Sequence, residues 1–333
     1  MYKQNNLYTK GIKEMFRIGV DLGGTNIVVG LVDQEYNIVE KESLPTMRER
    51  NGELIVADIA TLCKRVCKNH GIALADVTSI GIASPGVANS DTGIVEYANN
   101  LNFLNFPIAK LLSEMLDGYS NIYVENDANA AALGEAVAGA AKGFRSSIMI
   151  TLGTGVGGGI IIDGKVYSGF NHKGGELGHI VIQHNGRPCG CGRKGCWESY
   201  SSATGLINMT KEKIAECAAK GVKTKMTDIA EERGKINGRT AFDAARLGDI
   251  PAQEVVDEYI SYLACGITNI INIFQPEVLS IGGGISNEGQ SLIDALLPLV
   301  NVEQYGGALG KATDIRIAKL GNDAGIIGAA LLN

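Results

Sequence analysis

The sequence predicts an α/β protein built from two related halves. Strand-like apolar runs alternate with helical stretches along the 333-residue chain, a pattern typical of sheets covered by helices. A strand, a glycine-rich turn and a second strand also occur twice, over 21–33 and 151–163, with equal length. Such internal similarity indicates two structurally related halves. The cleft between two such halves is where we expect a ligand.

The composition is that of a globular protein and argues against several partners. Hydrophobic residues make up 45% of the chain, which is enough for two ordinary cores. The formal net charge is −6 and no basic stripe occurs, so we expect no nucleic-acid partner. No apolar run reaches the ~18 residues of a membrane span, and residues 1–15 lack a signal-peptide core. We therefore predict no membrane partner and a cytoplasmic protein.

Each half is expected to continue after its hairpin with alternating helices and strands. In the first half the first strand begins near Phe16, and the later helices and strands are expected over 54–69, 79–83, 108–116 and 122–125. In the second half, apolar residues at helical spacing predict a long helix over 252–274, which Gln275 and Pro276 end. A strand over 278–281 follows.

We therefore expect an N-terminal extension followed by two domains. The extension is residues 1–15, the small domain is 16–122 completed by a C-terminal helix at about 322–333, and the large domain is 123–321.

Three glycine-rich turns are candidate phosphate-binding loops. They lie at 23–25, 153–159 and 282–284, and successive backbone N–H groups in such turns form anion-binding nests. Asp21 precedes the first turn, where its carboxylate is suited to a hydrated Mg²⁺. None of the turns has the Walker pattern. One such turn alone is more simply a tight hairpin, but three together favour phosphate binding.

Asp127 lies where a strand leads into a helix, and two interpretations fit this place. Asp is a preferred helix N-cap. A carboxylate at the tip of a strand is also suited to be a general base, because the helix N-terminus favours its ionised form. The two interpretations differ in orientation, since a capping carboxylate points back at its own helix.

The segment 176–198 has the composition of a zinc site. His179, Cys189, Cys191 and Cys196 form a ligand set for one tetrahedral zinc. The chain has 7 cysteines, an odd number that fits a metal site in a reducing compartment better than a disulfide framework. Glu176 and Glu198 flank the ligands, so a loop held by zinc would present two carboxylates to a substrate.

Together these motifs resemble the ROK family of sugar kinases, which belongs to the actin-like, ribonuclease-H-like superfamily. The resemblance covers nearly the whole chain from Phe16 to Leu332. It rests on motifs at 21–25, 125–129, 152–158, 175–179, 189–198, 281–284 and 323–329. The histidine with the cysteine run is the most specific of them. The resemblance implies two ribonuclease-H-like (actin-like ATPase) domains with a central cleft and a zinc-stapled loop.

The resemblance also implies roles for individual residues. Asp127 is implied as the catalytic base. The implied sugar-binding residues are Gly86, Asn100, Asn126, Asp127, Glu176, His179 and Glu198. The implied nucleotide-binding residues are Gly23, Gly24, Thr25, Asn26, Gly153, Thr154, Gly155, Gly157, Gly283 and Gly284. The implied metal ligands are His179, Cys189, Cys191 and Cys196 for zinc, and Asp21 for Mg²⁺ through water.

The implied activity is phosphorylation of a hexose by ATP with Mg²⁺, glucose being the leading substrate and structural Zn²⁺ a further cofactor. N-acetylmannosamine, N-acetylglucosamine, fructose and allose remain alternatives, as does polyphosphate as the donor. A non-catalytic sugar sensor is an alternative of another class. The ~15 residues before the first strand are too few for the helix-turn-helix domain of family repressors. A homodimer is implied by the resemblance alone.

The sequence also departs from the family pattern. Phe170, Asn171, His172 and Lys173 stand where the family often has small residues. His172 and Lys173 either alter the rim of the pocket or are solvated. His184 lies off the ligand spacing, so we expect it at the surface.

Overall fold

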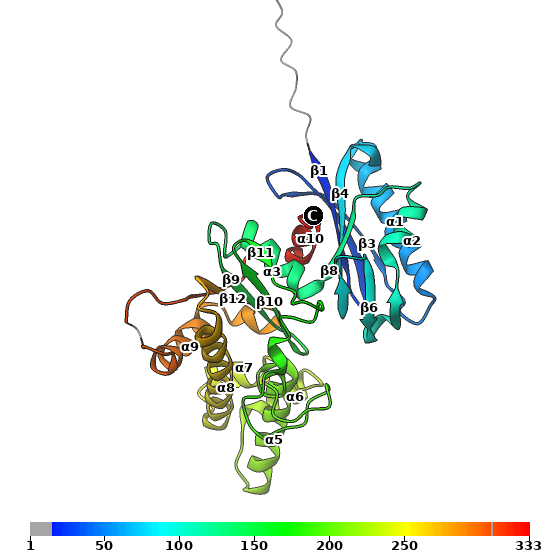
Figure 1. Cartoon of the computed structure of the whole chain (residues 1–333). Helices are drawn as coiled ribbons and strands as arrows, with labels where there is room; N and C mark the ends of the chain where they lie inside the picture. The colour runs from blue at the N-terminus through cyan, green and yellow to red at the C-terminus, as the bar shows by residue number, and fades with distance from the viewer. Residues whose placement is uncertain (1–14, 308) are drawn as a thin grey trace, which may run out of the picture.

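The computed structural model describes residues 15–307 and 309–333. All of the predicted N-terminal extension except Met15 therefore lies outside the described residues. Two five-stranded sheets form the centres of two lobes, with helices α3 and α10 between them (Figure 1). The predicted α/β class is confirmed.

The first lobe is built on a mixed sheet whose strand order is β3-β2-β1-β4-β8. β1 pairs antiparallel with β2 and parallel with β4, and β4 pairs parallel with β8. The strands are β1 (Phe16–Leu22), β2 (Asn26–Val32), β3 (Ile38–Pro45), β4 (Val77–Ser84) and β8 (Ile122–Asn126).

The second lobe repeats this order as β11-β10-β9-β12-β13. β9 pairs antiparallel with β10 and parallel with β12, as β1 does with β2 and β4. The duplicated hairpin predicted from the sequence is therefore confirmed, together with the strands that follow it. The strands are β9 (Ser147–Leu152), β10 (Val156–Ile162), β11 (Lys165–Val166), β12 (Val278–Gly282) and β13 (Asp314–Ile317).

Helices pack on each sheet, and the predicted ones are present with small shifts at their ends. The helices of the first lobe are α1 (Gly52–His70) and α2 (Ile108–Met115). Those of the second are α4 (Glu198–Ser201), α5 (Ala203–Ala219), α6 (Lys225–Glu232), α7 (Thr240–Arg246), α8 (Ile250–Phe274) and α9 (Gln290–Glu303). No helix of the described residues is long and apolar enough to cross a membrane.

A small antiparallel sheet lies beside the first lobe's main sheet and was not predicted. Its strands are β5 (Val87–Asn89), β6 (Ile94–Ala98) and β7 (Phe103–Phe106). β5 begins directly after Gly86, and the 3₁₀ turn Asn99–Leu101 after β6 carries Asn100. This sheet therefore positions two of the predicted sugar-binding residues.

Helices α3 (Asp127–Val137) and α10 (Ala324–Ala330) pack backbone to backbone against the sheet and each other. A Cβ on Gly19 would lie 1.8 Å from the Ile326 carbonyl oxygen, and one on Gly328 would lie 1.6 Å from that of Ala130. Only glycine fits such approaches. α10 lies within the predicted C-terminal helical segment and contacts β1 and β4 of the first sheet. The predicted boundary at 122 and 123 falls inside β8, so we propose that the chain leaves the first lobe along α3.

A buried carboxylate joins the two connections between the lobes. Glu135, near the end of α3, is 1% exposed. Its Oε1 accepts hydrogen bonds from the backbone N–H groups of Lys319 (2.9 Å) and Leu320 (2.7 Å). Its Oε2 accepts one from Ala140 N–H at 2.6 Å. The chain passes from α3 to β9 through Ala140 and from β13 to α10 through 318–323, so one side chain holds both connections.

Replacing Glu135 with Gln is expected to lower the free energy of unfolding by about 2 kcal/mol, as measured by urea denaturation. The amide keeps one acceptor oxygen, but its NH₂ group would face a backbone N–H donor that loses its partner. Glu232→Gln is the control, because Glu232 is exposed at the end of α6, where a change within ~0.5 kcal/mol is expected. Equal effects of the two substitutions would contradict the role of Glu135.

Candidate active site

Asp127 is the first residue of α3, and the structure assigns the helix cap to its neighbour. Asn126 is the N-cap, and its Oδ1 accepts hydrogen bonds from the N–H groups of Ala128 (2.9 Å) and Asn129 (3.2 Å). The N-cap interpretation of Asp127 is therefore wrong. Its Oδ1 accepts the adjacent Ala128 N–H at 2.8 Å, and the residue stays accessible to a ligand although surrounding atoms withdraw its carboxylate from bulk water. The carboxylate is thus free to meet a ligand.

Asp127 faces other negative charges across the site. Removal from bulk water raises the pKa of Asp127, and so does the charge of Glu176, while hydrogen bonds from Ala128 and other donors lower it in part. Burial, followed by the charge of Asp127, raises the pKa of Asp21 to about 6. Gly325 of α10 lies against the Asp21 carboxylate, since a Cβ there would be 3.3 Å from its Oδ2. A site with such uncompensated carboxylates is suited to a divalent cation.

The first-lobe residues of the predicted sugar site are held close to Asp127. Asn126 Nδ2 donates to the Gly86 carbonyl oxygen at 2.9 Å. Gly86 has φ 85°, and a Cβ there would lie 2.0 Å from the Tyr97 carbonyl oxygen, so only glycine fits. Asn100 lies beside the first glycine-rich turn. A Cβ added to Gly24 would lie 3.7 Å from the Cβ of Asn100. The structure thus brings residues of the predicted sugar site and of the first glycine-rich turn together.

The second-lobe residues of the predicted site follow β11. Glu176 is exposed, and its Oε2 lies 3.9 Å from Nε2 of His179, which ends the 3₁₀ turn Leu177–His179. Glu198 begins α4 and already has two protein partners. Its Oε2 accepts from Val156 N–H at 3.0 Å, and its Oε1 lies 3.6 Å from Cys189 Sγ. Its sugar-binding role stays a prediction.

The predicted metal ligands form one cluster. The ligand atoms of His179, Cys189, Cys191 and Cys196 all lie within 4.8 Å of one another. Cys189 Sγ is 3.7 Å from His179 Nδ1, and Cys191 Sγ is 3.6 Å from Cys196 Sγ. Ligands of a tetrahedral zinc with ~2.3 Å Zn–S bonds lie about 3.8 Å apart, so the geometry fits such an ion. None of the 7 cysteines forms a disulfide, as predicted, and His184 is exposed, as predicted.

The first glycine-rich turn lines a cavity of ≈ 610 Å³. Gly23 N–H closes the turn by donating to the Asn26 carbonyl at 2.9 Å, so it is not free for a phosphate. Lys41 of β3 also lines the cavity, with its Nζ 2.7 Å from Asp323 Oδ1. Sequence reasoning missed Lys41, because its strand is a mixed polar run that no motif marks. The complete lining is Asp21, Gly23, Gly24, Thr25, Asn26, Val28, Lys41, Glu42, Ser43, Asn322, Asp323 and Ile326.

The second glycine-rich turn is shorter than predicted. β10 begins at Val156, and Gly157 pairs with Thr151 inside the hairpin, so 157–159 are strand and not turn. Glycine is needed at Gly159 because α3 packs there, and a Cβ would lie 2.5 Å from that of Ala132. The remaining turn is held from outside, since Thr204 Oγ1 donates to the Thr154 carbonyl at 2.7 Å.

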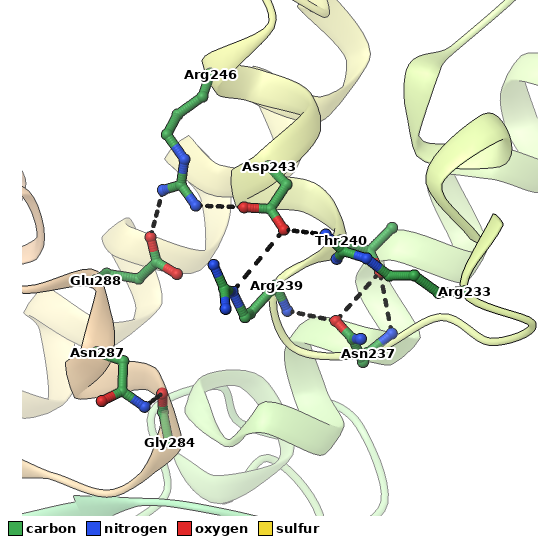
Figure 2. A network of polar contacts seen from close by, with 9 residues as sticks. All are labelled: Arg233, Asn237, Arg239, Thr240, Asp243, Arg246, Gly284, Asn287 and Glu288. Carbon is green, nitrogen blue, oxygen red and sulfur yellow. Dashed lines mark hydrogen bonds and ion pairs between the residues drawn. The ribbon is translucent and has the colours of Figure 1, made fainter.

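The third turn is anchored to α7 by a network of ion pairs (Figure 2). Gly283 has φ 82°, and Gly284 begins the 3₁₀ turn Gly284–Glu288. Arg246 bridges Glu288 at its Nη1 and Asp243 at its Nη2, both at 2.5 Å.

Asp243 is also bound by Arg233 at 2.7 Å. Burial alone would raise the pKa of Asp243, but the hydrogen bonds of Arg233 and Arg246 outweigh it and keep the pKa below its usual value. The network therefore fixes the third turn relative to the helices of the second lobe.

Comparison with known proteins finds the same family along the chain. The model of the "ROK family" matches residues 17–333. A glucokinase of Halalkalibacterium halodurans is 37% identical over 328 residues, which are 96% of each chain. An N-acetyl-D-glucosamine kinase of Aliivibrio fischeri is 33% identical over 95% of this chain and 98% of its own. The crystal structure of a ROK family glucokinase from Streptomyces griseus with glucose and AMPPNP is 33% identical, covers 95% of this chain and 98% of its own, and has a TM-score of 0.76.

Replacing Asp127 with Asn is expected to raise the melting temperature at pH 7.5 by a few degrees. In the folded protein the pKa of Asp127 is raised above its usual value, so its ionised form costs stability at high pH. This cost lessens as the pH falls through the raised pKa and vanishes below the ordinary value of 3.8, so the difference between the two proteins should shrink as the pH falls. Thermal unfolding at several pH values measures it. A lower melting temperature of the variant at pH 7.5 would contradict the charge repulsion.

Proposed function

The chain belongs to the ROK family, and we propose that it is an ATP-dependent hexose kinase that converts glucose to glucose 6-phosphate. The observation that carries this proposal is the position of the Asp127 carboxylate. It interacts with Asp21, beside the first phosphate turn, and with Glu176, beside the second-lobe sugar site. A base at this place can serve a hydroxyl that attacks a phosphate. The similarity to glucokinases over nearly the whole chain supports glucose as the substrate.

In the proposed reaction Asp127 takes the proton of the sugar's 6-hydroxyl, while the oxygen of that hydroxyl attacks the γ-phosphorus of ATP. The bond between that phosphorus and the β,γ-bridging oxygen breaks, and ADP leaves. Phosphoryl transfer needs mainly alignment, charge neutralisation and one base. The raised pKa of Asp127 makes it a stronger base than an ordinary carboxylate. The hydrogen bonds of Asn126 to Gly86 and α3 fix the backbone that carries it.

The proposed sugar site draws on both lobes. Gly86, Asn100 and Asn126 would contact the sugar from the first lobe, and Glu176, His179 and Glu198 from the second. Carboxylate and amide groups suit an uncharged ligand that offers several hydroxyl donors. Glu198 keeps acceptor capacity beside its bond to Val156, since each carboxylate oxygen has two lone pairs.

The proposed nucleotide site is formed by the three glycine-rich turns. Gly24, Thr25 and Asn26 of the first turn, and Thr154 and Gly155 of the second, would donate to phosphate oxygens. Mg²⁺, when bound, would neutralise phosphate charge, and Asp21 would hold it through water. Gly23, Gly153 and Gly157 use their backbone in the hairpins, so we propose that they shape the turns. Gly283 and Gly284 would lie against the adenosine.

We propose that the ligand cluster holds one structural zinc. His179, Cys189, Cys191 and Cys196 would fill all four positions and leave none open for substrate. His179 would bind through Nδ1, which faces Cys189, while its Nε2 faces Glu176. The bound ion would order this loop before the sugar arrives, which reduces the entropy cost of binding.

Other kinase substrates and a sensor are the competing proposals. N-acetylglucosamine is favoured among the alternatives by the relative that is named as its kinase. A non-catalytic sensor has no need of Asp127 or Asp21, and both are present here. A homodimer stays a prediction from the family resemblance.

A coupled assay of ADP release across a panel of hexoses tests the proposed function. With ATP and Mg²⁺, glucose is expected to give the highest kcat/KM. Asp127→Asn should lower kcat by about 10²–10⁴-fold, the usual contribution of a general base, while calorimetry still detects glucose binding. ADP release with N-acetylglucosamine and none with glucose would identify N-acetylglucosamine as the substrate in place of glucose. No release with any sugar would favour the sensor.

Removal of zinc by a chelator is expected to raise the KM for the sugar or to unfold the 176–198 loop. The four ligands fix the backbone that carries Glu176 and Glu198, and Mg²⁺ should not restore it because it prefers oxygen ligands. Metal content by mass spectrometry and steady-state kinetics check this together. Full activity in a rigorously zinc-free protein would contradict the structural role.

A further inference from the structure

His172 links the two sides of the proposed sugar site. We call these sides its first-lobe wall (Gly86, Asn100 and Asn126) and its second-lobe wall (Glu176, His179 and Glu198). It lies on the second-lobe loop 168–174, and its side chain is 11% exposed. Its Nε2 is 3.4 Å from Asp91 Oδ2 and its Nδ1 is 3.4 Å from Ser90 Oγ. Both partners belong to the turn between β5 and β6 of the first lobe. Each ring nitrogen of His172 therefore lies close to one polar group of this turn.

The loop around His172 is closed on itself and leads into Glu176. Gly174 N–H donates to the Ser168 carbonyl at 2.8 Å. His172 has φ 55°, a left-handed conformation that residues other than glycine rarely adopt. Such a conformation persists where surrounding contacts hold it. Leu177 N–H then donates to the Gly175 carbonyl at 2.6 Å, so the position of Glu176 follows that of the loop.

The backbone of the first-lobe turn that carries Asp91 is held by Asn89, while the Asp91 side chain is 83% exposed. Asn89 Oδ1 accepts from the N–H groups of Asp91 (3.1 Å) and Thr92 (3.2 Å). The same strand, β5, begins after Gly86, whose carbonyl is bound by Asn126. A contact at Asp91 therefore acts on the wall that carries Gly86.

A buried carboxylate, Glu125, also lies near His172. Glu125 of β8 is 5% exposed, and its pKa is raised by burial and lowered in part by hydrogen bonds and by His172. Glu125 Oε1 accepts from the Asn126 N–H at 2.8 Å. Glu125 belongs to the strand that leads into Asn126 and Asp127.

We propose that His172 is a positioning residue that sets the separation of the two sugar-site walls. By holding the 168–174 loop against the β5–β6 turn, it keeps Glu176 at a fixed distance from Gly86 before the sugar binds. Preorganisation of this kind lowers the cost of binding and leaves the chemical step unchanged. The inference rests on the proposed function and adds a residue that touches neither substrate.

The test compares His172→Asn, Asp91→Ala and the double variant. Asn tolerates the left-handed conformation but cannot span both partners. Each single variant should raise the KM for the sugar about three- to fivefold, the effect of one partly exposed pair. The kcat and the KM for ATP should stay within about twofold. The double variant should be no worse than either single one, because both remove the same contact.

Asn171→Ala is the matched control, since Asn171 is exposed on the same loop and makes no side-chain hydrogen bond among the described residues. It should leave all constants unchanged. Additive effects of His172→Asn and Asp91→Ala, or a fall in kcat equal to the change in kcat/KM, would overturn the proposal.

Amide hydrogen exchange separates this inference from the proposed function. In His172→Asn, exchange should accelerate over 168–176 and 89–93 and stay unchanged in α8. If the wild-type protein phosphorylates no sugar, the proposed function fails, and the exchange result alone decides whether His172 holds the loop. Unchanged exchange in both segments would overturn the contact itself.

Discussion

The arrangement of the lobes depends on the buried carboxylate of Glu135. Burying a charge is costly unless hydrogen bonds compensate it, and here three backbone N–H groups do so. Two of the donors belong to the connection that enters α10, and the third to the connection that leaves α3. A carboxylate can accept all three bonds at once, whereas no neutral side chain of this size offers as many acceptor sites. Both connections are thereby held at one point.

The neighbouring carboxylates of Asp21 and Asp127 would favour the binding of a cation and of a hydroxyl donor. Asp21 and Asp127 raise the folded protein's energy when both are ionised, and the fold elsewhere compensates that cost. Such local conflict between stability and arrangement is expected where function requires it. A cation and a hydroxyl donor would relieve the repulsion when substrates bind, so the ligand-free strain favours binding of both. Lys41 is paired with Asp323 on the same side, which keeps a positive charge near the first turn.

Much of the fold was predictable because strong periodic patterns and glycine turns mark it. The hairpins, α1, α8 and β12 follow such patterns, and Asp127 was correctly placed at the start of a helix. The cap at Asn126 was not predictable, since two neighbouring residues are both good caps. Gly157 and Gly159 were assigned to a turn because sequence does not reveal that α3 packs on β10. Glu135 and Lys41 act through partners more than 180 residues away in the sequence, and no local pattern shows such contacts.

Glu198 connects the cluster of His179 and the three cysteines with the second glycine-rich turn, beside its proposed role in binding the sugar. Its Oε2 accepts the Val156 N–H at the end of the second glycine-rich turn, and its Oε1 lies beside Cys189. A Cβ on Gly155 would lie 2.3 Å from Glu198 Oε2, so glycine at that position lets the carboxylate approach the turn. Ordering of the cluster would therefore order one phosphate-binding turn and the adjoining sugar ligands together. The proposed zinc, used in this way, would need no open coordination position, which is a physical reason for a closed set of three cysteines and one histidine.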